Sequence, residues 1–133
     1  MEGERRIPIV TDADIVRARQ QGREVASALP FTPSDLTVIA SAISELARNI
    51  FSYAGTGEIR VGLVERNGRR GVLVIAHDKG PGIRDVDLAL QDGYSTSGSL
   101  GLGLPGVRRL VDEFEINTQV GIGTEITLRK WAR

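Results

Sequence analysis

A glutamate and an asparagine one helical turn apart, Glu45 and Asn49, are the first residues of this sequence that could carry out chemistry together. A carboxylate such as that of Glu45 can act as a general base, taking a proton from a hydroxyl group or from water. The amide oxygen of Asn49 can bind Mg²⁺, which uses few protein ligands together with phosphate and water. On spacing alone, the simpler interpretation is a solvated polar pair on an exposed helix face.

A glycine-rich segment could bind phosphate groups. Seven glycines fall within the 27 residues from 80 to 106, where average usage would give about two. Glycines allow the backbone to approach a ligand closely, with amide N–H groups free to face phosphate oxygens. Gly101, Leu102 and Gly103 lead into an expected helix with Pro105 as an early residue, and the first turn of a helix favours an anion. An ordinary surface loop is the alternative interpretation.

A third group, Asp78, follows an apolar strand and precedes two of these glycines, Gly80 and Gly82. A carboxylate there can accept a hydrogen bond from an exocyclic amino group such as that of adenine. The two glycines would let the chain turn tightly around a flat base. Because Asp, Gly and Pro are also the usual turn residues, a simple turn is the alternative. The sequence has neither a Walker phosphate loop nor the dinucleotide-binding glycine pattern after its first strand.

The hydrophobic pattern predicts the elements that must position these groups. One helix is expected after a cap at Thr11 and ends before Pro30, and a second runs from a cap at Thr32 to about Tyr53. A third helix is expected at about 105–114, and strands are expected at 5–10, 58–65, 72–76, 114–120 and 124–129. This order predicts a two-layer α/β sandwich in which helices cover one face of the sheet.

The composition is that of an ordinary globular protein of 133 residues, with 41% hydrophobic and 26% charged residues. Lys and Arg total 17 and Asp and Glu total 17, so the zero net charge argues against an electrostatic nucleic-acid binder. With no Cys and one His, a thiolate or His-based metal site and a Ser-His-Asp triad are disfavoured. The sequence contains no apolar run near the roughly 20 residues of a membrane span, and we expect no signal peptide. We expect one domain, residues 1–133, in the cytoplasm.

The order of the motifs resembles that of the GHKL (Bergerat-fold) ATP-binding family, which includes gyrase, Hsp90, MutL and histidine kinases. The resemblance runs from about residue 32 to the end. It rests on four segments: Glu45-x-x-x-Asn49, Asp78-x-Gly80-x-Gly82, Gly101-x-Gly103 and Gly123-Thr124. It implies an α+β fold, in which a mixed, mostly antiparallel sheet carries helices on one face, and it implies ATP and Mg²⁺ as cofactors.

The same resemblance implies a role for each motif residue. Asn49 would hold Mg²⁺, and Glu45 would orient or deprotonate the incoming hydroxyl group. Asp78 would bind the adenine amino group, while Gly82 and Thr124 would help to position a water at the adenine. Residues from about 84 to 100 would form a lid over the nucleotide. The residues that the resemblance assigns to the nucleotide site are Asn49, Asp78, Gly80, Gly82, Gly101, Leu102, Gly103 and Thr124.

Longer segments are similar to the serine/threonine switch kinases of bacterial stressosomes. They are Glu45-Leu46-Ala47-Arg48-Asn49-Ile50, Asp92-Gly93-Tyr94-Ser95-Thr96-Ser97-Gly98, Leu104-Pro105-Gly106-Val107-Arg108-Arg109-Leu110 and the ending Arg129-Lys130-Trp131. This similarity implies phosphorylation of Ser or Thr on STAS-domain scaffold and antagonist proteins, and activation of a partner phosphatase after release. It implies no nucleic acid and no membrane as partner.

Several residues and functions keep a second interpretation. Arg48 or residues 95–97 could contact the γ-phosphate or the acceptor, although a polar loop is the simpler interpretation of 95–97. Trp131 could be a partner contact or a half-buried aromatic at a strand end, and His77 is expected to be a strand-end residue. Two other functions fit the same fold. One is an anti-sigma factor that sequesters a sigma subunit, and the other is a non-catalytic adaptor.

Overall fold

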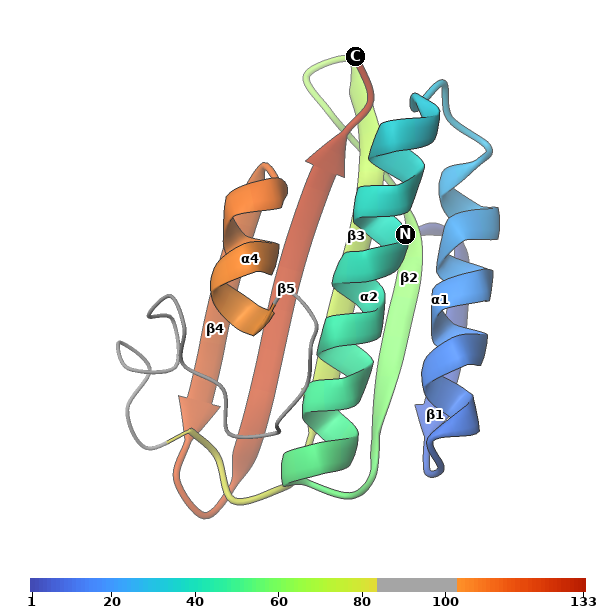
Figure 1. Cartoon of the computed structure of the whole chain (residues 1–133). Helices are drawn as coiled ribbons and strands as arrows, with labels where there is room; N and C mark the ends of the chain where they lie inside the picture. Colours follow the sequence, from blue (N-terminus) through green and yellow to red (C-terminus); the bar gives the residue numbers. More distant parts are fainter. Residues whose placement is uncertain (84–102) are drawn as a thin grey trace.

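Helices cover one face of a five-stranded sheet in the computed structural model, which describes residues 1–83 and 103–133 (Figure 1). In chain order the described elements are β1 (Glu2–Ile9), α1 (Ala13–Ala26), α2 (Pro33–Tyr53), β2 (Gly57–Arg66), β3 (Arg69–Asp78), α4 (Gly103–Leu110), β4 (Glu113–Gln119) and β5 (Gly123–Trp131). The strands lie in the order β1-β2-β3-β5-β4, and each neighbouring pair is antiparallel. The predicted two-layer α+β fold is confirmed, with antiparallel pairing throughout the described strands.

The core lies between the sheet and the helices because the strands alternate apolar side chains toward that face. Val61, Val74 and Leu128 form one row across β2, β3 and β5. All three are fully buried, together with Ile43 and Leu46 of α2. Full burial of such a side chain is worth roughly 1.5–3 kcal/mol relative to exposure. This packing fixes α2 across the middle of the sheet, from which its last turns reach the end of β3.

Helix α2 begins as the sequence predicts. The hydroxyl oxygen of Thr32 accepts a hydrogen bond from the backbone N–H of Asp35 at 3.1 Å, and Pro33 is the first helical residue. A proline there costs nothing because the first N–H groups of a helix have no partner within the helix. The cap and the apolar face together determine the axial position of the helix, and thus where Glu45 and Asn49 lie.

The predicted cap of the first helix is wrong. Asp12, not Thr11, is the N-cap residue of α1, and its side chain makes no capping hydrogen bond. The carboxylate of Asp14 instead accepts hydrogen bonds from the backbone N–H groups of Val10 and Thr11, at 2.9 and 3.0 Å, and from the Thr11 hydroxyl. These hydrogen bonds lower the pKa of Asp14. Asp14 thus ties the start of α1 to the end of β1.

Three other helix boundaries differ from the prediction. Helix α1 ends at Ala26 rather than near Pro30, because residues 27–29 form tight turns closed by hydrogen bonds to residues 23, 25 and 26. Helix α4 spans Gly103–Leu110 rather than 105–114. The chain turns at Asp112, whose N–H donates to the Arg129 carbonyl at 3.0 Å and whose carboxylate accepts from the Trp131 N–H at 2.7 Å. These contacts with β5 hold the turn in place. Strand β4 begins at Glu113, the residue after the turn.

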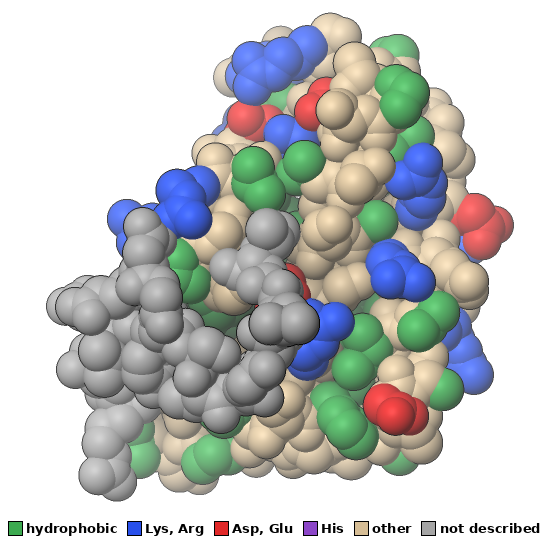
Figure 2. Space-filling view, viewed as in Figure 1, with side chains coloured by type: hydrophobic (Ala, Val, Ile, Leu, Met, Phe, Trp, Pro, Cys, Tyr) green, Lys and Arg blue, Asp and Glu red, His purple; other side chains and the backbone are tan. Residues whose placement is uncertain are grey.

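The surface of the described residues carries charges of both signs. On the face shown in Figure 2, Lys and Arg side chains lie scattered among Asp and Glu and form no single basic patch. Within residues 1–83 and 103–133, we find no helix that is both long enough and apolar enough to cross a membrane.

Candidate active site

A row of polar side chains crosses one end of the sheet, where the apolar rows stop. Asp78 on β3 pairs with Thr124 on β5, and Thr124 pairs with Thr118 on β4. Residues that pair across antiparallel strands project to the same face, so all three side chains lie on the helix-covered face. Asp78 and Thr124 are buried, with exposed fractions of 7% and 6%. We call this row the base end of the site, since two of its members are the predicted adenine-binding residues.

The chain leaves β3 at the base end through a turn that glycines permit. The N–H of Gly80 donates to a carboxylate oxygen of Asp78 at 2.9 Å, so the Asp-initiated turn is present. A Cβ on Gly80 would lie 2.5 Å from the Cβ of Ala54 at the end of α2. Gly82 has a φ of +78°, and a Cβ there would lie 2.4 Å from the Gln119 carbonyl oxygen. These glycines let the backbone pack closely between α2 and the β4–β5 connection.

Thr118, which lies at the β4 end of this row, was not identified from the sequence. Its hydroxyl oxygen accepts a hydrogen bond from the backbone N–H of Ile83 at 2.9 Å. The same oxygen lies 2.8 Å from the hydroxyl of Thr124 and 3.1 Å from the carbonyl oxygen of Gly123. The available signal was strand alternation, which places Thr118 on the same face as Ile116. Thr118 therefore joins its own strand to β5 and to the segment that contains Ile83.

The other part of the site lies on α2, and we call it the phosphate end. Glu45 is 8% exposed, so the interpretation as an exposed polar pair is wrong for this residue. It is wrong because α4 packs against this part of α2. Arg48 donates a hydrogen bond to one carboxylate oxygen of Glu45 at 2.5 Å, and the N–H of Gly103 donates to the other at 3.3 Å. Asn49 follows one turn later and is half-buried.

The first residue of α4, Gly103, thus faces the Glu45 carboxylate directly. Helix N-termini favour negative charge because their N–H groups have no partners within the helix. Gly101 and Leu102 lie outside the described residues, as do the expected lid and residues 95–97. Their proposed contacts with phosphate or acceptor remain predictions. The structure therefore brings together Glu45 and Gly103 of the predicted set at this end, and Asp78, Gly80, Gly82 and Thr124 at the base end.

The donor groups of the phosphate end suit a metal that is bound mainly by its substrate. In the described part of the chain, no group of three or more His, Cys, Asp and Glu side chains could form a protein cage for a metal. Mg²⁺ commonly takes one or two protein oxygens and completes its shell with phosphates and water. The half-buried amide of Asn49, beside the buried carboxylate of Glu45, supplies that kind of oxygen. The residues present therefore fit Mg²⁺ together with a nucleotide.

Two residues singled out from the sequence lie away from this site. His77 is on the uncovered face of the sheet, 3.5 Å from Glu125, which agrees with a strand-end role. Trp131 is 5% exposed, and its indole N–H donates to Glu113 at 3.1 Å. Burial would raise the pKa of Glu113, but hydrogen bonds from Arg66 and Trp131 outweigh it and lower that pKa. The interpretation of Trp131 as a strand-end aromatic is confirmed, and its burial exceeds the expectation.

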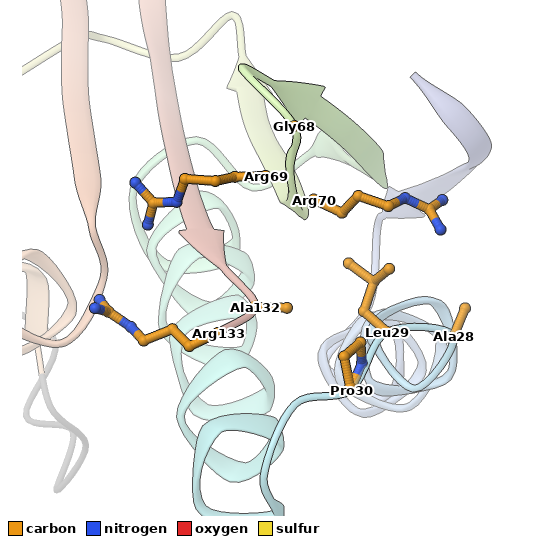
Figure 3. A pocket seen from close by; sticks show the side chains of 8 residues that line it. All are labelled: Ala28, Leu29, Pro30, Gly68, Arg69, Arg70, Ala132 and Arg133. Carbon is orange, nitrogen blue, oxygen red and sulfur yellow. The ribbon is translucent and has the colours of Figure 1, made fainter.

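A cavity of about 650 Å³ lies elsewhere, between the α1–α2 connection, the β2–β3 turn and the end of β5 (Figure 3). Leu29 and Pro30 form part of its wall. Its three arginines do not converge, since Arg69 and Arg133 point to one side and Arg70 to the other (Figure 3). This arrangement does not form an anion site, and none of the predicted site residues lines the cavity.

Comparison with known proteins agrees with the geometry. Residues 34–132 match the family described as histidine kinase-, DNA gyrase B- and HSP90-like ATPase. The serine/threonine-protein kinase RsbT of Bacillus subtilis is 54% identical over 127 residues, covering 96% of each chain. An anti-sigma F factor of Clostridium kluyveri is 25% identical over 117 residues, covering 85% of this chain and 82% of that protein.

Solved structures show the same fold at lower identity. The RsbU and RsbW domains of Rv1364c from Mycobacterium tuberculosis match with a TM-score of 0.65 and 22% identity, over 98% of this chain and 33% of that one. The mycobacterial sensor histidine kinase MprB matches with a TM-score of 0.58 and 20% identity, over 98% of both chains. The chain therefore belongs to the GHKL ATPase family and, within it, to the RsbT-type serine/threonine-protein kinases.

Proposed function

We propose that this kinase transfers the γ-phosphate of ATP to Ser or Thr residues of STAS-domain scaffold and antagonist proteins in stress signalling. We further propose that, once released from them, it activates a partner phosphatase. The observation that carries the proposal is the buried carboxylate of Glu45, which lies between α2 and the first residue of α4. The 54% identity to RsbT supports the kinase activity, and the longer segments shared with stressosome switch kinases are the reason for this choice of partners.

In the proposed reaction, the chain positions groups rather than forming a covalent intermediate, as is general in phosphoryl transfer. The acceptor hydroxyl oxygen bonds to the γ-phosphorus while the bond from that phosphorus to the β–γ bridging oxygen breaks. The hydroxyl proton passes to the carboxylate of Glu45, and ADP leaves. Arg48 holds this carboxylate in place, and the Gly103 N–H, its other partner in the structure, turns to the phosphates when the nucleotide binds. The carboxylate of Asp78 accepts a hydrogen bond from the adenine amino group.

The remaining assignments belong to the same proposal. Asn49 would hold Mg²⁺, whose contribution when bound is to neutralise phosphate charge. Gly101, Leu102 and Gly103 would donate backbone N–H groups to the phosphates. Gly80 would shape the backbone beside the adenine, and Gly82 and Thr124 would help to position a water there. Residues 1–133 would act as one domain, in the cytoplasm, where ATP is available.

A direct test mixes the purified chain with radiolabelled ATP, Mg²⁺ and a STAS-domain antagonist from the same genome. We expect acid-stable label on a serine or threonine of the antagonist. Asn49→Ala should abolish the transfer, whereas Asn117→Ala, an exposed residue on the uncovered sheet face, should leave it intact. Antagonist that stays unlabelled, although ATP binds, would contradict the proposal.

The anti-sigma alternative makes a different prediction in a parallel experiment. The 25% identity to an anti-sigma F factor is the observation that keeps it in view. Immobilised chain would be offered equal amounts of a sigma factor and of the STAS-domain antagonist. Retention of the antagonist alone supports the stress-kinase proposal, and retention of the sigma factor alone favours the alternative.

A further inference from the structure

Lys130 links the end of helix α4 to the start of helix α2. Its ammonium group donates a hydrogen bond to the carbonyl oxygen of Leu110, the last residue of α4, at 3.1 Å. The same group lies 3.8 Å from a carboxylate oxygen of Asp35 in the first turn of α2. The end of α4, the start of α2 and the end of β5 lie together at one end of the molecule (Figure 1). Lys130 belongs to the ending Arg129-Lys130-Trp131, to which the proposed function gives no role.

The side chain of Lys130 lies between the sheet and the helices. Lys130 pairs with Val72, which is fully buried, and residues that pair across antiparallel strands project to the same face. The side chain is 12% exposed, so its apolar stem is covered while the ammonium group reaches the two oxygens. A charged group so far removed from water is favourable only where it finds such acceptors. The ammonium group of Lys130 is therefore held by the end of α4 and the start of α2 together.

Directional contacts hold the two ends of α4, whereas apolar packing holds its middle. The N–H of Gly103 donates to Glu45 at the N-terminus, and the C-terminal carbonyl of Leu110 accepts from Lys130. The last carbonyls of a helix have no partner within the helix and favour a cation. Val107, between the two ends, is fully buried, but apolar burial is not directional. The contacts at the ends therefore determine where α4 lies along its own axis.

Nucleotide binding leaves Lys130 as the directional contact that holds α4 in this arrangement. In the proposed reaction the Gly103 N–H exchanges the Glu45 carboxylate for the phosphates, whereas the Leu110 carbonyl keeps its donor. Lys130 is too distant to attract the phosphates directly, because a helix of eight residues spans about 12 Å. The Debye length at physiological salt is about 8 Å, so most of that attraction is screened. An effect of Lys130 on phosphate binding therefore passes through α4.

We propose that Lys130 is a positioning residue, which holds α4 at the axial position where its N-terminal N–H groups receive the phosphates of the nucleotide. The proposal rests on the proposed function, in which Gly103 donates to the phosphates. Lys130 touches no part of the nucleotide in this scheme and lies at neither end of the site. Loss of its ammonium group lets α4 shift along its axis, so that the phosphates are bound less tightly while the base is bound as before.

The test is a ratio of affinities for two ligands that share the base end. The Kd of ADP, with Mg²⁺, and the Kd of adenosine are measured at physiological salt by displacement of a fluorescent ADP analogue. Lys130→Met keeps the apolar stem and removes the ammonium group. We expect the wild-type chain to prefer ADP and the preference to fall roughly 5- to 10-fold in Lys130→Met, because hydrogen bonds to charged groups such as phosphate are the stronger ones. Lys130→Arg, which keeps a cationic donor for the Leu110 carbonyl, should retain the wild-type ratio.

A merely structural role for Lys130 predicts a different result. Lower stability without a shift of α4 would reduce the melting temperature but leave the ratio unchanged wherever the chain is folded, which would overturn the inference. Arg70→Met is the matched control, since it also removes one positive charge, from a side chain that pairs with Glu2, and it should not alter the ratio. Where Lys130→Met does not fold, Lys130→Gln is judged by the same ratio.

The outcome also separates this inference from the proposed function. A wild-type chain that binds ADP no more tightly than adenosine would overturn both the phosphate end and the role of Lys130. A wild-type chain that prefers ADP, with an unchanged ratio in Lys130→Met, would overturn only the role of Lys130.

Discussion

The two ends of the candidate site are held by different kinds of contact. At the base end, backbone packs against backbone: Gly82 approaches the Gln119 carbonyl, and Thr118 joins three segments by hydrogen bonds. At the phosphate end, charged side chains make the contacts, since Glu45 bridges Arg48 and the N-terminus of α4. The first end is built by the sheet itself, and the second by side chains between two helices.

This difference separates the tasks of the two ends. Close backbone packing leaves this end little conformational freedom, so its shape is fixed before a ligand binds. The base end is therefore suited to selecting a ligand. Charged side chains can exchange one partner for another at modest cost, so the phosphate end is suited to groups that change during the reaction. Substitutions at the base end should therefore act on stability and affinity, whereas those at the phosphate end should act on the rate.

The largest effect is expected at the phosphate end. Glu45→Gln keeps an acceptor for the Gly103 N–H but accepts a proton poorly, so the kcat of phosphotransfer should fall by about 10²–10⁴-fold. The Kd of ADP should change little. Steady-state kinetics and titration measure the two quantities, with the exposed Glu115→Ala as control. A variant with unchanged kcat would remove Glu45 as the base.

The packing at the base end predicts a large loss of stability for Gly82→Ala. The new Cβ meets both a left-handed φ and the Gln119 carbonyl. Gly68 is a matched control, because its φ is also +78° but nothing lies within 4 Å of a Cβ there. Urea unfolding should give Gly82→Ala a loss about 1–3 kcal/mol greater than that of Gly68→Ala. Equal losses would mean that the close approach is easily relieved.

We predict that the affinity of the base end for a nucleotide depends on Asp78 in particular. Asp78→Asn replaces a carboxylate acceptor by an amide, and hydrogen bonds to charged groups are stronger than neutral ones. The Kd of ADP should rise roughly 10-fold, while kcat at saturating ATP falls less. Asp12→Asn, at the exposed start of α1, is the control. Unchanged affinity in the Asp78 variant would separate this carboxylate from nucleotide binding.

The smallest effect is expected from a region remote from both ends. Hydrogen bonds from Thr11 and Val10 lower the pKa of Asp14, so its contribution to stability is complete above the pKa of the unfolded chain. That contribution is lost as the pH falls through the lower pKa of the folded chain. Thermal unfolding between pH 2 and pH 7 should show a shallower acid decline for Asp14→Asn than for the wild-type chain. An identical decline would place the acid sensitivity elsewhere.

The sequence predicted what local patterns determine. The cap at Thr32, the length of α2 and the alternating strands follow from neighbouring residues, and the structure confirms them. The start of α1 was wrong because the Thr11 hydroxyl donates to the Asp14 carboxylate and caps no backbone N–H of the first turn. The end of α4 was wrong because a contact from the last strand determines it.

The candidate site shows the same division. The motif order was enough to place Asp78 and Thr124 in one site, and register brings them together. The burial of Glu45 could not be predicted from α2 alone, because α4 provides the cover. The role of Thr118 depends on hydrogen bonds between strands and to Ile83, which no local pattern encodes.

The pairing of β5 with β3 has a consequence for folding. Asp78 leaves the ribosome well before Thr124, and the base end exists only after the segment between them has closed into a loop. Contacts so distant in sequence form slowly and cost chain entropy. A nucleotide that touches both strands would stabilise the closed form by mass action. ADP present during refolding should therefore stabilise the chain once β5 has paired with β3. The last step of folding would then be coupled to nucleotide binding.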